Sequence, residues 1–262
     1  MIEYNILRKF MELSKNKEGV YAQLGKKKMR EKYSLFAVEG YKSVCDTIDN
    51  FNVEALVAVR GFDIPEEWAG KGAVYEVSAE RMAKISSLST PSEVMAVYRI
   101  PEDFYTVVPV PDKDKLYLAL DEVQDPGNLG TIIRTAHWFG VTRIYCSKTT
   151  ADLFNPKTVQ STMGSLGKVE VVYCDLERLL KENSDMPVYG TLLNGKNIYE
   201  AELTQSGFII MGNEGRGISE ALRPLISSPL LIPPYNQADH SESLNVAIAT
   251  AITLSQFRSR IV

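Results

Sequence analysis

A short polar stretch behind an apolar run holds residues that could bind an anion or position a reacting group. The stretch Asp125-Pro-Gly-Asn128-Leu-Gly130 follows the run KLYLALDEV (115–123) and leads into a helical pattern that contains Arg134. Proline and glycine together favour a tight turn, and Gly130 permits close approach of a ligand or of another backbone segment. Asn128 could cap the helix or donate to an anion. Taken alone, the segment is equally an ordinary capped helix with a solvent-facing arginine.

A second candidate turn is rich in glycine. The segment IIMGNEGRGIS (209–219) has three glycines within six residues, and Gly212, Asn213 and Glu214 follow directly on an apolar run. The order GxxGxG differs from the GxGxxG of dinucleotide-binding folds, and the sequence contains no phosphate-binding loop that ends in Gly-Lys-Ser/Thr. A nicotinamide or nucleoside-triphosphate site is therefore poorly supported. Taken alone, the segment is a tight turn between a strand and a helix.

A third polar segment begins near the end of the chain. Ile232 precedes two prolines, and Ser243, Leu244 and Asn245 precede a run of small and apolar residues. Serine is a common N-cap, so we expect Ser243 to begin the final helix. By itself this segment predicts a loop followed by a buried helix.

The elements that must position these three segments alternate along the chain. Residues 1–100 predict a small α/β unit, in which 53–59 is a strongly apolar strand. Residues 101–114 contain several prolines and charges and predict a linker. Residues 115–262 alternate apolar strands with helices, including one expected at 217–226. Such alternation indicates a parallel sheet covered on both faces.

Composition limits the class of protein. The chain has 262 residues, of which 45% are hydrophobic and 24% charged, as in a globular protein of two domains. It has no apolar run long enough for a membrane span and no secretory pattern, so we expect a cytoplasmic protein without a membrane partner. Its three cysteines lack CxxC spacing and its histidines number two, so we expect no metal site.

Charge is unevenly distributed. The net charge of −4 argues against a general nucleic-acid coat, yet residues 1–32 are rich in lysine and arginine. Lys26, Lys27, Lys28 and Arg30 could form a patch that contacts RNA phosphates. The alternative is a solvated helical face with no partner.

Together, the three segments resemble the signature motifs of the SpoU family of RNA 2′-O-ribose methyltransferases, within the knotted SPOUT superfamily. The resemblance covers the whole second half of the chain and is weaker in the first half, where 34–44 looks like a substrate-binding domain. The segments that carry it are DPGNLGTIIRTA (125–136), NPKTVQSTMGSL (155–166), IIMGNEGRGIS (209–219) and IP…SLNVAIA (232–233 and 243–249).

The resemblance implies a fold and a set of partners. We expect an α/β protein whose C-terminal parallel-sheet domain contains a deep trefoil knot, preceded by a smaller α/β RNA-binding domain. The resemblance further implies S-adenosylmethionine as cofactor, a homodimer, and ribosomal RNA or transfer RNA as substrate. The additional N-terminal domain favours ribosomal RNA. A noncatalytic RNA-binding protein on the same fold is the alternative, and a nucleotide-dependent doubly wound enzyme is a weaker one.

The resemblance also assigns residues. Matching positions imply catalytic roles for Arg134, Asn128, Glu214 and Ser243. The positions that match cofactor contacts are Thr191, Leu192, Gly212, Asn213, Ile232, Leu244 and Asn245.

Two points within the resemblance stay open. Arg134 could act as a general base, but guanidinium rarely gives up its proton, so clamping an RNA phosphate and stabilising a developing alkoxide is physically easier. The family usually has a shorter, glycine-containing stretch where this chain has residues 234–242. This departure puts the cofactor contacts of that loop in doubt.

Overall fold

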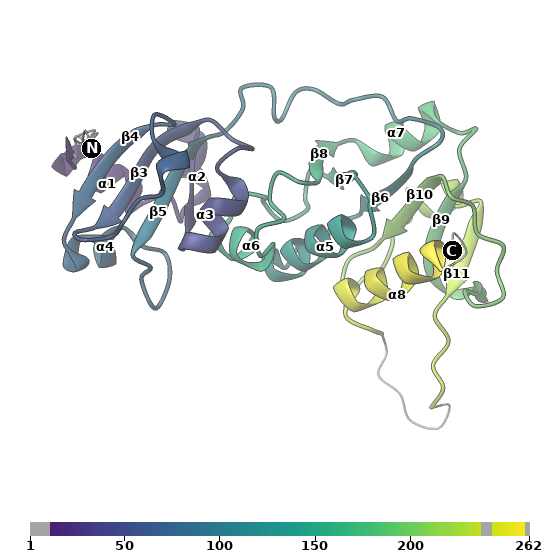
Figure 1. Cartoon of the computed structure of the whole chain (residues 1–262). Helices are drawn as coiled ribbons and strands as arrows, with labels where there is room; N and C mark the ends of the chain where they lie inside the picture. Colours follow the sequence, from purple (N-terminus) through teal and green to yellow (C-terminus); the bar gives the residue numbers. More distant parts are fainter. Residues whose placement is uncertain (1–10, 237–242, 260–262) are drawn as a thin grey trace, which may run out of the picture. The chain divides into compact units, whose positions relative to one another are not determined.

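The computed structural model describes residues 11–236 and 243–259 (Figure 1). The unusual loop predicted at 234–242 therefore lies mostly outside the described residues. The chain divides into two compact units. The first runs to Pro101 and also takes in Phe154–Pro156, and the second consists of Glu102–Leu153 and the chain from Lys157 onward. In these described ranges, no helix is both long and apolar enough to cross a membrane.

The first unit contains a mixed five-stranded sheet in the order β1-β4-β3-β5-β2. Strands β1, β4 and β3 are parallel, and β5 runs antiparallel to both of its neighbours. Alternate residues of β3, such as Ala55 and Val57, enter an apolar core with Met82 and Val97. The elements are β1 (Met11–Glu12), α1 (Lys15–Tyr21), α2 (Lys27–Tyr33), β2 (Leu35–Glu39), α3 (Tyr41–Thr47), β3 (Val53–Val59), the 3₁₀ turn η1 (Glu66–Trp68), β4 (Ala73–Val77), α4 (Ala79–Ile85) and β5 (Val94–Arg99).

The second unit is built on six strands, all parallel, in the order β11-β9-β10-β6-β7-β8. The central strands β6 and β10 are buried along their whole length, as expected for a parallel sheet covered on both faces. The elements are β6 (Leu116–Leu120), α5 (Pro126–Trp138), β7 (Arg143–Ser147), α6 (Pro156–Ser161), β8 (Glu170–Cys174), α7 (Leu176–Glu182), β9 (Val188–Asn197), β10 (Gly207–Met211), the 3₁₀ turn η2 (Arg223–Leu225), β11 (Ser228–Leu231) and α8 (Val246–Arg258).

The helix predicted at 217–226 is wrong. The segment is irregular except for the single turn η2. Gly217 has a left-handed φ of 69°, and the backbone N–H of Ser219 donates to the carboxylate of Asp121 at 2.7 Å. Because the segment is tied to the residue that follows β6, it cannot wind into a regular helix.

The turn predicted at Pro126 and Gly127 is also wrong, since both residues belong to the first turn of α5. Asp125 is the N-cap, and its Oδ1 accepts from the backbone N–H of Asn128 at 2.9 Å. Proline suits the first helical position because its missing N–H would have no partner there. The helix thus begins two residues before Asn128, the cap that the sequence suggested.

Gly130 allows α5 to approach α6. A Cβ at this position would lie 2.5 Å from both the Cβ of Ser161 and the carbonyl oxygen of Thr158. The close approach expected from the sequence is therefore to backbone and not to a ligand.

The final helix is capped by Asn245 and not by the predicted Ser243. Its side-chain oxygen accepts from the backbone N–H groups of Ala247 at 2.9 Å and Ile248 at 3.3 Å. Helix α8 packs against α5, as Figure 1 shows. The capping contact fixes Asn245 at the start of α8, on the side of the molecule where α5 also begins.

Candidate functional site

The three segments singled out in the sequence follow strands of one parallel sheet. Asp121 follows β6, Gly212 follows β10, and Ile232 follows β11. Since the carboxyl ends of parallel strands share an edge, these segments lie along the edge where α/β proteins bind ligands.

Hydrogen bonds between side chains connect all three segments. The side-chain nitrogen of Asn245 donates to Oδ1 of Asn128 at 3.0 Å, and Nδ2 of Asn128 donates to Oε1 of Glu214 at 3.0 Å. Each segment thus contributes one side chain to a continuous chain, which we call the Asn128 relay: Asn245, Asn128 and Glu214. The relay brings together three of the residues selected from the sequence.

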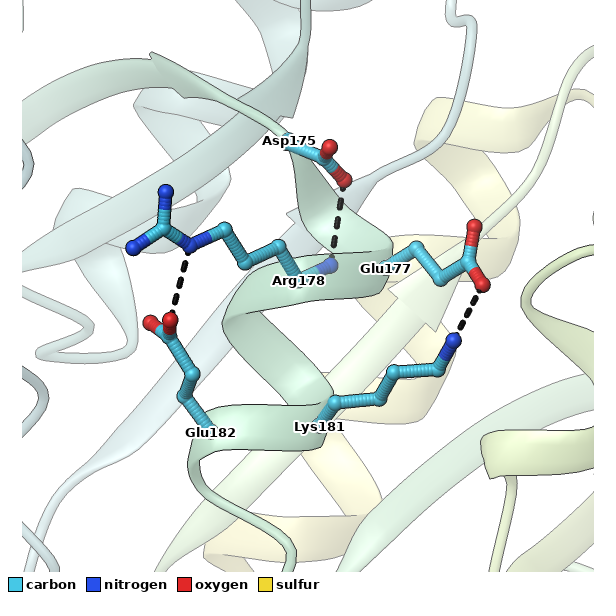
Figure 2. Close-up of a pocket in the computed structure, with 5 residues that line it drawn as sticks. All are labelled: Asp175, Glu177, Arg178, Lys181 and Glu182. Atoms are coloured by element: carbon cyan, nitrogen blue, oxygen red, sulfur yellow. Dashed lines mark hydrogen bonds and ion pairs between the residues drawn. The ribbon is translucent and has the colours of Figure 1, made fainter.

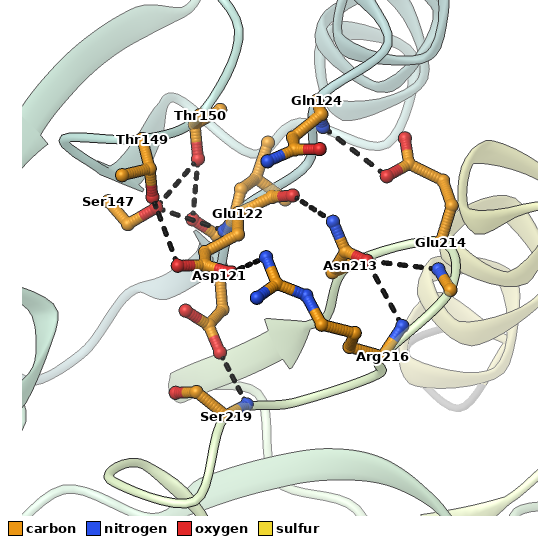
Figure 3. A network of polar contacts seen from close by, with 12 residues as sticks. Asp121, Glu122, Gln124, Ser147, Thr149, Thr150, Asn213, Glu214, Arg216 and Ser219 are labelled. Atoms are coloured by element: carbon orange, nitrogen blue, oxygen red, sulfur yellow. Dashed lines mark hydrogen bonds and ion pairs between the residues drawn. The ribbon is translucent and has the colours of Figure 1, made fainter.

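Glu214 receives further donors from the backbone. The N–H groups of Gln124 and Asp125 both lie 3.3 Å from its carboxylate oxygens (Figure 3 shows the contact with Gln124). Partial burial acts to raise the pKa of Glu214, but the hydrogen bonds from Asn128 and from the backbone outweigh it, so the net pKa lies below the ordinary value. Glu214 is therefore held as a carboxylate at the start of α5.

Asn213 holds its own loop in shape. Its Nδ2 donates to the backbone carbonyl of Glu122 at 2.8 Å, and its Oδ1 accepts from the N–H groups of Gly215 and Arg216, each at 3.0 Å. Its backbone N–H and carbonyl both pair with Gly217. The polar groups of Asn213 are thus engaged within the protein, although the family resemblance places it among the cofactor contacts.

The remaining cofactor positions lie further along the same edge. Gly190 of β9 is level with Ile210 of β10, so Thr191 and Leu192 are the next residues beside Met211 and Gly212. A Cβ at Gly212 would lie 2.3 Å from the backbone of Gly217, so the loop that follows requires this glycine.

The pairing of β9 with β11 is interrupted at this edge. It includes Gly190 with Pro229 and resumes only at Lys196 with Leu230. Residues 191–195 therefore bulge out of the ladder, which leaves a backbone segment at the edge that is not used by β11.

Arg134 and the residues before α8 lie at the surface. Arg134 is exposed on α5, and no hydrogen bond or ion pair of its guanidinium occurs within the described residues. Ser243 and Leu244 are exposed immediately before Asn245, and Leu244 is 47% accessible. The exposed guanidinium of Arg134 is available to a partner, whereas the relay residues contact one another.

The predicted basic patch includes one error. Lys26, Lys27 and Lys28 are exposed, but Arg30 is only 2% accessible. Its Nη1 donates to the carbonyl oxygens of Leu24 at 2.8 Å and Gly25 at 2.9 Å. Arg30 therefore stabilises the turn before α2 and does not present its charge to RNA.

A separate hollow lies along α7, away from the three segments. Figure 2 shows that its charged side chains pair with one another, Arg178 with Glu182 at 2.7 Å and Lys181 with Glu177 at 2.5 Å. These are exposed pairs one helical turn apart, which contribute little to stability. Throughout the described ranges, this hollow included, no group of three or more histidine, cysteine, aspartate or glutamate residues could hold a metal ion.

The sequence interpretation missed several charged residues at the site. Glu122 pairs with Arg216, and Lys157 pairs with the carboxylate of Asp125 at 2.6 Å. Asp121 and Glu122 could have been found from their position directly behind a buried strand. Lys157 offered no comparable signal, because its proximity to Asp125 depends on how α6 packs against α5.

Known proteins resemble the chain over nearly its whole length. Residues 115–255 match the SpoU rRNA Methylase family, and residues 20–96 match the MRM3-like substrate binding domain. The 23S rRNA (guanosine(2553)-2′-O)-methyltransferase of Bacillus subtilis is 34% identical over 255 residues, which cover 95% of this chain and 99% of that protein.

Solved structures agree with this match. A TrmH-family protein from Porphyromonas gingivalis has a TM-score of 0.83 and 36% identity, and covers 95% of this chain and 100% of its own. The AdoMet-bound rRNA methyltransferase from Sinorhizobium meliloti has a TM-score of 0.82 and 30% identity, over 96% of this chain and 97% of its own. With the three segments joined at one sheet edge, these matches establish that the chain belongs to the SpoU rRNA methylase family.

Proposed function

We propose that this protein is an enzyme that methylates a ribose 2′-hydroxyl of ribosomal RNA with S-adenosylmethionine. The observation that carries the proposal is the Asn128 relay, in which the three family segments meet through hydrogen bonds of about 3.0 Å. The full-length similarity to a 23S rRNA 2′-O-methyltransferase supports ribosomal RNA over transfer RNA as the substrate.

The edge of the sheet suits the proposed cofactor. S-adenosylmethionine supplies a methyl group activated by a sulfonium centre. We infer that Thr191, Leu192, Gly212, Ile232 and Leu244 hold it. The bulge at 191–195 offers backbone amides and carbonyls outside the β9–β11 ladder, and the aliphatic side chains offer apolar contact. Asn213 supports this site through its own loop.

The residues of the relay position the acceptor side of the reaction. Methyl transfer needs a ribose oxygen aligned with the methyl group and relieved of its proton around the time of attack. Asn128 and Glu214 form a fixed polar surface at the start of α5, and Ser243 lies exposed beside it. We infer that these groups orient the ribose.

Arg134 is the residue on which we expect turnover to depend most. Its exposed guanidinium, on the helix that begins with Asn128, is free to receive a phosphate from RNA. A planar fork bound to phosphate would stabilise negative charge that develops on the ribose oxygen. This role requires no loss of the guanidinium proton, which makes it easier than general-base action.

The finer features of the fold belong to the same proposal. We infer the deep trefoil knot from the family segments and the full-length structural similarity. We further propose a division into an RNA-binding domain (1–100), a linker (101–114) and a catalytic domain (115–262), which the unit boundary at Pro101 supports. Trp138 is 85% and Ile248 is 53% accessible on the mutually packed helices α5 and α8, which favours a homodimer.

A direct test is incorporation of labelled methyl from S-adenosylmethionine into ribosomal RNA and transfer RNA transcripts. We expect label in ribosomal RNA, at a position where the methylated ribose blocks alkaline cleavage. Activity should survive EDTA, because no metal is invoked. Label in a base, or in transfer RNA alone, would contradict the proposal, and absence of both label and cofactor binding would favour a noncatalytic RNA-binding protein.

A further inference from the structure

The edge that would receive RNA carries several negative charges. Asp121, Glu122, Asp125 and Glu214 lie within or beside the three segments. An anionic polymer that approaches four carboxylates is repelled unless cations or hydrogen-bond donors compensate them. The way in which each carboxylate is compensated therefore indicates where RNA can bind.

Three of the four carboxylates are satisfied without help from Arg216. Asp121 is buried and accepts from the backbone N–H of Ser219 at 2.7 Å, while Glu214 accepts from Asn128 and from the backbone. Asp125 pairs with Lys157, and this contact is the main cause of its lowered pKa. Glu122 is the one that pairs with Arg216.

Glu122 is held in a backbone conformation that glutamate rarely adopts. Its φ is 58°, in the left-handed region. Its N–H donates to Oγ of Ser147 at 2.9 Å, and its carbonyl accepts from Asn213 at 2.8 Å (Figure 3). These contacts fix the backbone on both sides. The carboxylate oxygen Oε1 also accepts from Oγ1 of Thr149 at 3.4 Å, and the other oxygen, Oε2, accepts from Arg216.

Arg216 is fixed at both ends and still accessible. Its backbone N–H donates to Oδ1 of Asn213 at 3.0 Å, and its Nη2 donates to Oε2 of Glu122. The side chain is nevertheless 69% accessible. A guanidinium has five N–H donors, and within the described residues only Nη2 has a side-chain partner. The remaining donors are therefore oriented and available.

The side chain of Arg216 points away from the part of the inferred cofactor site that β9 and β11 provide. Its partner Glu122 follows β6, and Glu122 in turn contacts Ser147, the last residue of β7, and Thr149, which lies just beyond it (Figure 3). The sheet order is β11-β9-β10-β6-β7, so Arg216 points to the β6–β7 side. On the opposite side of β10 lie Thr191 and Leu192, which belong to β9, and Ile232, which follows β11.

We propose that Arg216 binds a backbone phosphate of the substrate RNA and that Glu122 is the positioning residue that orients its guanidinium. This inference rests on the proposed function, because it requires an RNA substrate. An exposed, preoriented arginine beside a carboxylate-rich edge supplies the fork geometry that phosphate recognition uses. It also offsets the repulsion between that edge and the RNA.

The test measures RNA affinity as a function of salt for two matched variants. Arg216→Ala removes the proposed contact. Arg178→Ala removes an equally exposed arginine on α7, 75% accessible and also paired with one glutamate, away from the site. We expect Arg216→Ala to weaken binding of a ribosomal RNA fragment about five- to tenfold. The slope of log K against log salt should become shallower by about 1, which corresponds to the loss of one phosphate contact. Arg178→Ala should change neither.

Two further measurements make the outcome decisive. Arg216→Lys keeps the charge without the fork, so it should retain the salt slope and recover only part of the affinity. Affinity for S-adenosylmethionine should be unchanged in every variant. If Arg216→Ala binds RNA like the wild type, or if it loses cofactor affinity instead, the inference is overturned. If the wild type itself neither binds nor methylates ribosomal RNA, the proposed function fails, which is a different result.

Discussion

Replacing Glu214 with glutamine tests whether the carboxylate holds the site together. Glu214 accepts one side-chain hydrogen bond at 3.0 Å from Asn128 and two longer ones at 3.3 Å from the backbone of Gln124 and Asp125. A glutamine amide keeps one acceptor oxygen but turns an NH₂ group toward N–H donors. Hydrogen bonds to a charged group contribute about 1.5–3 kcal/mol each at good geometry, and the two long ones contribute less. We therefore expect Glu214→Gln to lower the free energy of unfolding by about 2 kcal/mol.

The same contacts predict a dependence on pH. The pKa of Glu214 in the folded chain lies below its ordinary value of 4.5, so folding favours the ionised form. This stabilisation is complete above the unfolded-state pKa and is lost as the pH falls through the folded-state pKa. The difference in stability between the wild type and Glu214→Gln should therefore be largest near neutrality and shrink in acid. Taking the difference cancels the contribution of Asp125, whose pKa is also lowered.

Urea unfolding at neutral pH and at pH values below 4.5 measures this difference. Glu182→Gln, which changes an exposed glutamate on α7, is the control and should have almost no effect. The reasoning is refuted if Glu214→Gln is as stable as the wild type at neutral pH, or if its deficit is the same in acid. In the methylation assay, we expect the variant to lose turnover more than cofactor affinity.

The remaining predictions concern packing, catalysis and assembly. Gly130→Ala should destabilise the protein by about 1–3 kcal/mol in urea unfolding, because its Cβ would overlap α6. As the control, Gly127→Ala should lower the free energy of unfolding by less, because its Cβ would meet only a lysine side chain and the Asp125 carboxylate. Arg134→Lys should bind S-adenosylmethionine normally in titration calorimetry but lose at least about tenfold in kcat, since the fork is absent; unchanged kcat would remove Arg134 from the mechanism. Ile248→Glu should shift a homodimer toward monomer in light scattering, and an unchanged mass would show that α8 does not form the interface.

Much of the second unit was predictable because its signals are local. The strands at β6, β8 and β10 are short apolar runs flanked by polar residues, and such runs indicate buried parallel strands without any knowledge of their neighbours. The apolar residues of 217–226 do have helical spacing, but the helix predicted there does not form. The contact with Asp121 and the left-handed φ of Gly217 prevent it. β4 was missed because AVYEV is short and follows two glycines, which suggest a loop.

The sequence by itself determined which residues the site contains, since family segments are recognised from residue types and their order. Asn128, Glu214 and Asn245 were selected in this way. Tertiary structure alone decided that they touch: Glu214 is 86 residues from Asn128, and Asn245 is 117 residues from it. The contact of Glu214 with Asn128 depends on the strand order of the sheet, which places β10 beside β6. The contact of Asn245 with Asn128 depends on the packing of α8 against α5, which brings the starts of the two helices together.

The same distinction separates the two arginines that the sequence interpretation treated differently. Arg30 was expected at a surface patch, but folding buries it against the carbonyls of Leu24 and Gly25. Arg216 was not selected, yet the strained Glu122 holds it exposed at the site. The charge of a side chain is set by its residue type, but whether that charge meets solvent, backbone or a carboxylate depends on packing between segments distant in sequence.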